Sequence, residues 1–474
     1  MKISSKISPE LQEFISTQNL FDLKNLHEGV VHIGFPQQIE KTIQSVQSLF
    51  EESGVDSKIY FVHKATKNNA FIKQAYKLGI GVDVASYNEL VSALSCGFVG
   101  DRIECTGPKN DDFLRLALCH CCTINLDSLQ ELERLIVIYK QLQLTTTIKV
   151  LIRINNPIIE GRNIAIKPSR FGSNPNDLSQ FYCIFQKNSF LRFDGFHFHA
   201  YGYDPLMRAG ILANTIELIK DAFDHGFEPN TINIGGAFRE KTINNYQDWS
   251  TYIEDLEQKI VTSSPLPTWG KDQFGLFLNE QGRIGGKEKA ISRFYNSSMI
   301  NDLQIILNSE TSDGRNVNII LAENMINLVI EPGFALLQQA GISIIRIIES
   351  KTFSDGRSGI IVEGNIYNLS IANMLHYTID PILIKQNPNQ TNQKYSTFIA
   401  GNLCHEDDFL VEREVEFDQV PEAGDLLVFV NTAGYYAGFE DATPIMHPIS
   451  QQLVAFQKNN SWQITTPTNY NPYH

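Results

Sequence analysis

The sequence contains no long hydrophobic run and no block of basic residues. Among its 474 residues no segment approaches the length of a membrane-spanning helix, and the formal net charge is -14. An acidic chain without a basic stretch is a poor match for nucleic acid or for an anionic membrane. The opening residues MKISSKISPELQEF also lack the apolar stretch of a secretory signal. We therefore expect a cytoplasmic protein with no membrane or nucleic-acid partner.

Cysteine is scarce, and the seven cysteines form no regular framework. An odd number of cysteines without regular spacing fits a reducing compartment. The densest group, CHCC at 119–122, could suggest a metal site, but no second Cys/His pair at ligand spacing completes one. In RLALCHCCTINLDS the small apolar residues lead into a strand, where free cysteine packs as a small hydrophobe. We predict no metal site.

What is present is an ordinary globular composition with a regular alternation between residues 45 and 335. Hydrophobic residues make up 42% of the chain. Segments of helical period are followed by short apolar runs, as in IEKTIQSVQSLFEESG before KIYFVHKA and DSLQELERLIVIYKQL before TIKVLIRIN. Such alternation predicts parallel strands joined by helices, and about eight units close into a (β/α)8 barrel. The fold class is therefore α/β over 45–335.

Two regions depart from this alternation. Residues 239–312 carry Trp249 and Trp269 and are too long for an ordinary connection, so we expect an inserted segment in the barrel. After residue 335, runs such as GIIVEGN and DLLVFVNTAGYYAG predict strands separated by turns. We expect residues 1–44 and 336–474 to form an all-β domain of sandwich or barrel type.

Reactive side chains stand at the predicted carboxyl ends of the barrel strands, where the active sites of such barrels lie. A lysine can bind an aldehyde cofactor, a carboxylate can keep a pyridinium nitrogen protonated, and a histidine ring can stack on an aromatic ring. Paired glycines allow N–H groups to approach a phosphate, although a Gly-Gly pair more often marks only a tight turn. Together these residue types indicate pyridoxal phosphate. They are Lys64, Asp83, Arg153, His197, His199, Gly235, Gly236 and Glu331.

Eight short segments, in order along the chain, resemble the fold-type III pyridoxal phosphate decarboxylases, the family of ornithine, diaminopimelate and biosynthetic arginine decarboxylases. FVHKATKN resembles the family's Y-A-x-K-x-N, GVDVASYNEL its G-x-D-x-A-S-x-x-E-L, SRFG its K-F-G loop, and GFHFHAYG its G-x-H-x-H-x-G-S. INIGGAF resembles D-x-G-G-G, EPGF resembles E-P-G-R, GNLCHEDD resembles G-P-x-C-x-x-x-D, and GYY at 434–436 resembles G-A-Y.

The resemblance implies a role for each matched residue. Lys64 would bind the cofactor as a Schiff base, His199 would stack on its ring, and Glu331 would lie beside the ring nitrogen. Cys404 would donate a proton from the opposite subunit of a head-to-tail homodimer. Asp83 and Glu89 would tune the charge of Lys64, whereas Lys67 is expected on the surface and His197 in a structural role. The implied cofactor-binding residues are Lys64, Asp83, His199, Gly202, Gly235, Gly236, Ala237, Glu331, Gly333, Phe334 and Tyr436.

The chain departs from the family motifs around the phosphate. Phe334 stands where the family has arginine, and Ala237 where it has a third glycine. Gly202 replaces a serine, and Asn233 an aspartate. These changes remove a cation and a hydroxyl from the expected cup, while Lys64 is retained. We expect the core chemistry to be retained and the substrate to be unusual.

Three further residues are expected to contact the substrate or complete its site. His405 follows Cys404, where relatives place a carboxylate that recognises a distal amine. A histidine there argues against a simple diamine-forming substrate, or it is a solvent-facing loop residue. The resemblance also pairs Arg170 with Asp408 across the subunit interface, and the alternative is two solvated surface charges.

The function predicted from the sequence is decarboxylation of an amino acid, with a specialised substrate included. A racemase on the same barrel would use Lys64 and an opposing tyrosine as two bases. A non-catalytic regulator that has lost its cofactor is the alternative from another class. The long C-terminal region with its C-x-x-x-D segment favours the decarboxylase.

Overall fold

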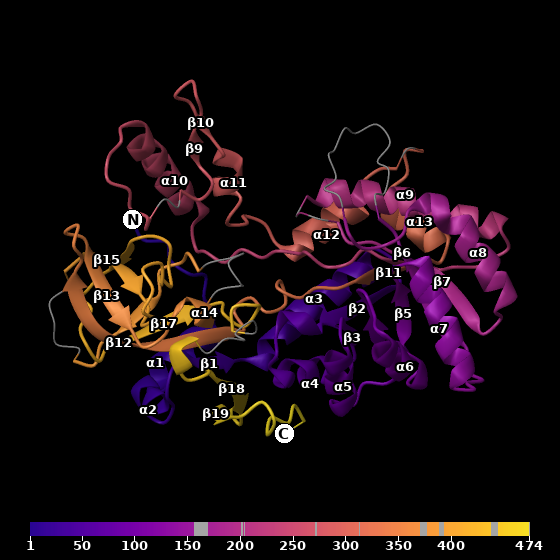
Figure 1. The fold of residues 1–474 in the computed structure, drawn as a ribbon, viewed down its shortest axis with the longest axis horizontal. Coiled ribbons are helices and arrows are strands. Elements are labelled where there is room, and N and C mark those ends of the chain that lie inside the picture. Colours follow the sequence, from indigo (N-terminus) through magenta and orange to yellow (C-terminus); the bar gives the residue numbers. More distant parts are fainter. Residues whose placement is uncertain are drawn as a thin grey trace. The chain divides into compact units, whose positions relative to one another are not determined.

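The computed structural model describes the whole chain except residues 156–168, 201, 203, 271–272, 312, 370–376, 388–392, 438–443 and 474. The chain divides into two compact units (Figure 1). The barrel unit contains Ile39–Arg239 and Ser298–Leu336. The β-rich unit contains Met1–Gln38, Glu240–Ser297 and Leu337–Tyr470.

The barrel unit contains a closed barrel with the strand order β11-β2-β3-β4-β5-β6-β7-β8. Every neighbouring pair is parallel, and the predicted (β/α)8 barrel is confirmed. All residues of β3, β4 and β5 are buried, as expected for parallel strands covered on both faces. The strands are β2 (Ser57–Val62), β3 (Gly81–Val84), β4 (Ile103–Cys105), β5 (Thr123–Leu126), β6 (Ile148–Arg153), β7 (Leu191–His197), β8 (Thr231–Asn233) and β11 (Asn327–Ile330).

Helices connect the strands and surround them (Figure 1). Several begin where a side chain accepts an N–H of the first turn: Asn68, Ser86, Asn110 and Ser128 each act in this way. The α-helices are α3 (Ile39–Glu52), α4 (Asn69–Lys77), α5 (Tyr87–Ser95), α6 (Asp111–Cys119), α7 (Leu129–Gln141), α8 (Leu178–Lys187), α9 (Pro205–Asp224), α12 (Met299–Leu307) and α13 (Val317–Glu323). Short 3-10 turns are η2 (His63–Ala65), η3 (Gly100–Arg102) and η4 (Pro175–Asp177).

The β-rich unit is a nine-stranded sheet. Its main path runs β16-β15-β13-β12-β1-β18-β19, with β17 between β12 and β14. The N-terminal strand β1 (Val31–Gly34) pairs with both β12 (Gly341–Thr352) and β18 (Gln451–Lys458), so the two ends of the chain share one sheet. The other strands are β13 (Ser358–Val362), β14 (Ile382–Ile384), β15 (Tyr395–Ala400), β16 (Val415–Phe417), β17 (Leu426–Val430) and β19 (Ser461–Thr465); the helices are α1 (Pro9–Thr17), α2 (Leu20–Asn25) and α14 (Ile366–Leu369), and the 3-10 turns are η1 (Pro36–Gln38) and η5 (Pro444–Met446).

The segment expected as an excursion at 239–312 belongs with the β-rich unit as far as residue 297. It forms α10 (Tyr246–Val261), the hairpin β9 (Phe277–Leu278) and β10 (Ile284–Gly285), and α11 (Lys287–Ile291), which lie together in Figure 1. The Trp269 ring packs 4.1 Å from the ring of Phe409. The next helix, α12, is again part of the barrel unit. At the other boundary, α3 is continuous across residue 45, where the sequence suggested that the barrel begins.

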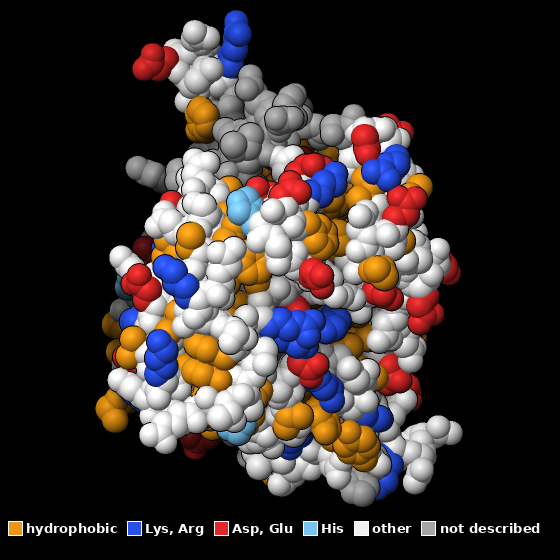
Figure 2. All heavy atoms as spheres, turned by 90° about the vertical axis from the view of Figure 1, so that its right-hand side faces the viewer, with side chains coloured by type: hydrophobic (Ala, Val, Ile, Leu, Met, Phe, Trp, Pro, Cys, Tyr) orange, Lys and Arg blue, Asp and Glu red, His pale blue; other side chains and the backbone are white. Residues whose placement is uncertain are grey.

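Within the described part of the chain, no helix is long and apolar enough to cross a bilayer. Figure 2 shows one face of the molecule, on which acidic and basic side chains are interspersed.

Candidate active site

Lys64 lies directly after β2, in the turn η2. Its side chain is exposed, whereas its neighbours His63 and Ala65 are buried. The His63 Nε2 lies 2.8 Å from the Ser92 hydroxyl, which donates in turn to Asn69 Oδ1 at 3.0 Å. These contacts hold the turn, so that Lys64 is presented at the carboxyl end of the strand. The positive charge of Lys64 acts on both Asp83 and His199.

Three buried carboxyl groups meet at this end of the barrel: Asp83 from β3, Glu104 from β4 and Glu331 directly after β11. Burial and then the charge of Glu331 raise the pKa of Asp83, and the same two causes raise the pKa of Glu104 to about 8. Burial also acts to raise the pKa of Glu331, but contacts with His197 and with the Asn233 amide outweigh it and lower that pKa to about 2. These opposite shifts favour negative charge on Glu331 over Asp83 and Glu104.

Asn233 links these groups, and sequence reasoning missed its role. Its Nδ2 donates to Glu331 Oε1 at 2.8 Å and to Glu104 Oε2 at 3.0 Å, while its Oδ1 accepts the Gly235 N–H at 2.8 Å. An ionised aspartate at this position could not donate to either carboxyl group. The departure from the family motif at residue 233 therefore fits a cluster that already contains three carboxyl groups.

His197 is placed beside Glu331, closer to the chemistry than expected. Its Nε2 lies 3.2 Å from Glu331 Oε1, a contact short of regular hydrogen-bond geometry. Burial lowers the pKa of His197, although the neighbouring Glu331 opposes that shift. Burial thus favours the neutral imidazole, while the contact between the two groups favours an ionised Glu331. Residue Asp194 is an extra residue of β7 relative to β6, and such a bulge changes which face the following side chains occupy.

The ring of His199 is exposed to solvent although protein groups surround much of it. Desolvation by the surrounding protein lowers the pKa of His199, with Glu331 opposing and Lys64 adding to the shift. Gly235 lies directly against this residue: with φ at +69°, a Cβ there would fall 2.8 Å from His199 Nδ1. A neutral, accessible imidazole is suited to stack on an aromatic ring.

The Gly235–Gly236 pair is required by close packing as well as by turn geometry. A Cβ on Gly236 would lie 2.4 Å from the carbonyl oxygen of Glu331. Among the described residues, the N–H groups of Gly236 and Ala237 donate to no group of the chain. Ala237 has φ at +62°, the left-handed region in which the family's third glycine would be unstrained. Free N–H groups in such a turn can bind an anion.

The other predicted site residues of the barrel unit are at the ends of its strands or in the loops that follow them. Gly202 has φ at +114°, a conformation that a serine would adopt only with strain. Phe334 is half-buried in the turn after β11, and Gly333 is buried beside it. In the SRFG segment, the Phe171 ring lies under the guanidinium groups of Arg170 at 3.9 Å and Arg153 at 4.7 Å.

Glu89 has a structural role that the family resemblance did not suggest. Its Oε2 accepts the Ala85 N–H at 2.7 Å, and its own N–H donates to Ser86 Oγ at 3.2 Å. These two bonds cap the start of α5, in an arrangement close to a capping box in which the carboxylate accepts the N–H of Ala85 rather than that of the N-cap Ser86. Lys67 is exposed, in agreement with its expected surface position.

The other predicted residues belong to the β-rich unit, and their expected convergence on the barrel of a second subunit stays a prediction. Cys404 and His405 are exposed. Asp408 is buried, and its two carboxylate oxygens accept the N–H groups of Ile366 and Leu403, both at 2.8 Å. These bonds shape the loop that presents Cys404, whereas the Arg170–Asp408 pair remains untested. The buried Tyr436 ring packs 5.7 Å from that of Tyr377.

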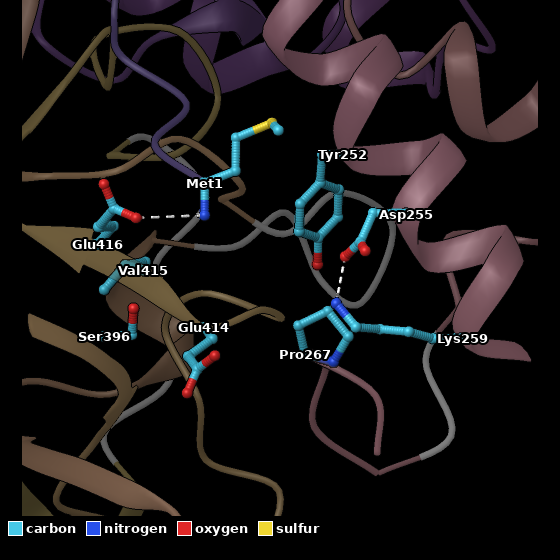
Figure 3. A pocket seen from close by; sticks show the side chains of 9 residues that line it. All are labelled: Met1, Tyr252, Asp255, Lys259, Pro267, Ser396, Glu414, Val415 and Glu416. Carbon is cyan, nitrogen blue, oxygen red and sulfur yellow. Dashed lines mark hydrogen bonds and ion pairs between the residues drawn. The ribbon is translucent and has the colours of Figure 1, made fainter. Parts of the chain in front are cut away.

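A pocket of about 110 Å³ lies elsewhere, inside the β-rich unit (Figure 3). Its charged groups face one another: the Met1 amino group lies 3.4 Å from Glu416 Oε2, and Lys259 pairs with Asp255. None of the predicted site residues lines this pocket. It therefore plays no part in the candidate active site.

A parallel barrel with an accessible lysine, a buried ionised glutamate and free loop N–H groups at one end defines the class of barrel enzymes that bind an aldehyde cofactor bearing a phosphate. Residues 36–283 match the family model described as pyridoxal-dependent decarboxylase, pyridoxal binding domain, and the chain belongs to this family. The protein is thus a pyridoxal phosphate-dependent decarboxylase. The family, the fold and the cofactor predicted from the sequence are confirmed.

The chain is also similar to two curated proteins and to a solved structure. It is 28% identical over 445 residues to the uncharacterized protein y4yA of Sinorhizobium fredii, covering 92% of this chain and 90% of that relative. It is 23% identical over 429 residues to the L-glutamyl-[BtrI acyl-carrier protein] decarboxylase of Niallia circulans, covering 85% and 84%. A crystal structure of diaminopimelate decarboxylase from M. jannaschii with L-lysine has a TM-score of 0.67 at 18% identity, covering 97% of this chain and 94% of that one. That last similarity shows the fold.

Proposed function

We propose that this protein decarboxylates an amino acid at the carboxyl end of the barrel, with Lys64 bound covalently to the cofactor aldehyde. The observation that carries the proposal is the charge distribution of the carboxyl cluster. Contacts with His197 and Asn233 lower the pKa of Glu331, whereas burial raises the pKa values of Asp83 and Glu104, so negative charge is favoured on Glu331, where a pyridinium nitrogen can be paired. Bound pyridoxal phosphate supplies a sink for the electron pair that remains when the carboxylate leaves.

Each barrel residue has a task in this scheme. Glu331, held by the Asn233 amide, would accept a hydrogen bond from the N–H of the ring nitrogen and so favour the protonated ring. The His199 ring, accessible and neutral, supports one face of the cofactor. The loop after β8 would offer N–H groups, that of Ala237 among them, to the phosphate. Lys64 would hold the cofactor aldehyde, and its amine could act as a base and an acid at this end of the barrel.

The proton that replaces the lost carboxylate is proposed to come from Cys404 of a second subunit. The thiol is exposed in its own unit, on a loop held by Asp408. An exposed thiol can approach a second chain, and a thiol is a competent proton donor near neutral pH.

We propose a specialised substrate rather than a simple basic amino acid. His405 is exposed beside Cys404, and its Nδ1 accepts the Asp407 N–H at 3.2 Å, which leaves Nε2 to face a ligand. An imidazole can donate a hydrogen bond to a carboxylate or carbonyl of the substrate. One relative acts on a glutamyl group carried by a protein, so conjugated amino acids belong in the substrate panel.

The test combines trapping with a product assay. The protein, loaded with pyridoxal phosphate, is reduced with borohydride and mapped by mass spectrometry. We expect the added mass on Lys64, its retention in Lys67→Ala as the matched neighbouring control, and its loss in Lys64→Ala. Release of CO2 from a panel of basic, acidic and conjugated amino acids then identifies the reaction. An added mass on another lysine overturns the assignment of Lys64, and racemisation without CO2 favours the racemase.

A further inference from the structure

A buried arginine contacts the loop after β8, which contains Gly235 and Gly236, through the carbonyl groups of that loop. Arg208 lies in the first turn of α9 and is only 3% exposed. Its Nη1 donates to the Gly236 carbonyl oxygen at 2.6 Å and its Nη2 to that of Ala237 at 3.4 Å. The guanidinium carbon also lies 4.4 Å from the centroid of the Phe238 ring. One cation thus contacts three consecutive residues of the loop after β8.

These bonds determine which way the loop presents its peptide groups. In a trans peptide the C=O and the following N–H point in opposite directions. Because Arg208 holds the carbonyls of Gly236 and Ala237, the N–H groups of Ala237 and Phe238 point away from it. The Ala237 N–H has no acceptor among the described residues. A cation on the carbonyl side also polarises the peptide and strengthens the N–H as a donor.

The same bonds offset the strain at Ala237. A non-glycine residue in the left-handed region costs about 1–2 kcal/mol, and Ala237 stands there with φ at +62°. The charge of Arg208 also reaches the site, since it contributes to lowering the pKa of His199. Phe334, which follows Gly333 in the adjoining turn, brings no charge.

We propose that Arg208 is the positioning residue of the phosphate loop: it turns the loop N–H groups toward the phosphate and supplies positive charge behind them. This inference rests on the proposed function, since it requires pyridoxal phosphate at the barrel mouth. It assigns to α9 a role in cofactor retention that the sequence motifs do not contain.

The experiment compares two ligands that differ only in the phosphate. Dissociation constants of pyridoxal phosphate and of pyridoxal are measured by equilibrium dialysis for the wild type, Arg208→Gln and Arg208→Lys. Arg102→Gln is the matched control. Like Arg208, Arg102 donates to two carbonyls and lies over aromatic rings; the carbonyls are those of Tyr76 and Ile80, and the rings those of Tyr76 and Phe98. Arg102 differs in its location, because it stands before β4, at the opposite end of the strand from the candidate site.

We expect Arg208→Gln to weaken pyridoxal phosphate binding roughly 10- to 100-fold, with pyridoxal affected less than about 3-fold. Arg208→Lys keeps the positive charge but cannot bond both carbonyls in the same way, so its affinity for pyridoxal phosphate should fall about 10-fold. If Arg208→Gln does not fold, Arg208→Lys alone tests the role of Arg208. Arg102→Gln should leave both constants unchanged. Equal losses for both ligands, or no loss, overturn the role of Arg208. A wild type that binds no pyridoxal phosphate overturns the proposed function as well.

Discussion

At the scale of single residues, the carboxyl cluster contains side chains that can be identified from the sequence at the ends of strands, and others that cannot. Lys64 and Glu331 could be singled out because each follows a buried apolar run. Glu104 could not, because in DRIECTG it has the position of an ordinary strand residue. Its importance comes from the bond to Asn233, 129 positions away in the sequence, which only the closed barrel creates.

Glu104 gives a prediction of pH dependence. Its pKa is raised from 4.5 to about 8 in the folded protein, so the folded state binds more protons than the unfolded state between those values. The free energy of unfolding of the wild type should therefore fall as the pH rises through this window. Glu104→Gln removes this titration. Between pH 5 and 8 the free energy of unfolding of the variant, relative to that of the wild type, should therefore rise by on the order of 3 kcal/mol.

Urea unfolding of both proteins at the two pH values, without added cofactor, measures this gain. Glu133→Gln, which changes an exposed carboxylate on α7, is the control and should show no gain. A constant difference between wild type and Glu104→Gln at both pH values would contradict a protonated Glu104.

At the scale of elements, the alternation of helical segments and apolar runs was sufficient to predict the barrel. In this region the periodicity of the apolar residues agrees with the burial that the barrel gives them. α9, for example, spans Pro205–Asp224 and joins β7 to β8. The boundaries of the segment after β8, expected at 239–312, could not be predicted from the sequence in the same way. Its assignment depends on Trp269 packing among Phe353, Phe398 and Phe409, residues far along the chain whose proximity no local period encodes.

The start of α5 allows a structural role to be separated from a catalytic one. Glu89→Ala removes the bond to the Ala85 N–H and should cost about 1 kcal/mol, which corresponds to a loss of roughly 2–4 °C in the melting temperature. Glu89→Gln can still accept the Ala85 N–H and should melt close to the wild type. Cofactor absorbance recorded against pH should be the same in all three proteins. A shifted absorbance profile in either variant would instead show that Glu89 tunes Lys64.

At the scale of the whole molecule, the candidate chemistry is divided between two units of one chain. Lys64, His199 and Glu331 belong to the barrel unit, while Cys404 and His405 belong to the β-rich unit. The sequence motifs identified both groups, but spacing along one chain does not say whether they meet within a subunit or between two. The distinction has a direct consequence for mixtures of inactive variants.

Lys64→Ala and Cys404→Ala are each expected to be nearly inactive alone. If Cys404 acts on the barrel of the opposite subunit, a mixed dimer has one site with both Lys64 and Cys404, and one site with neither. Random association of equal amounts makes half of the dimers mixed, so co-expression should restore about a quarter of the wild-type CO2 release per subunit. The Lys64→Ala/Cys404→Ala double variant, co-expressed with the wild type, calibrates the degree of mixing. If both residues acted within one chain, no site in the mixture would be complete, and activity would stay at the level of the separate variants.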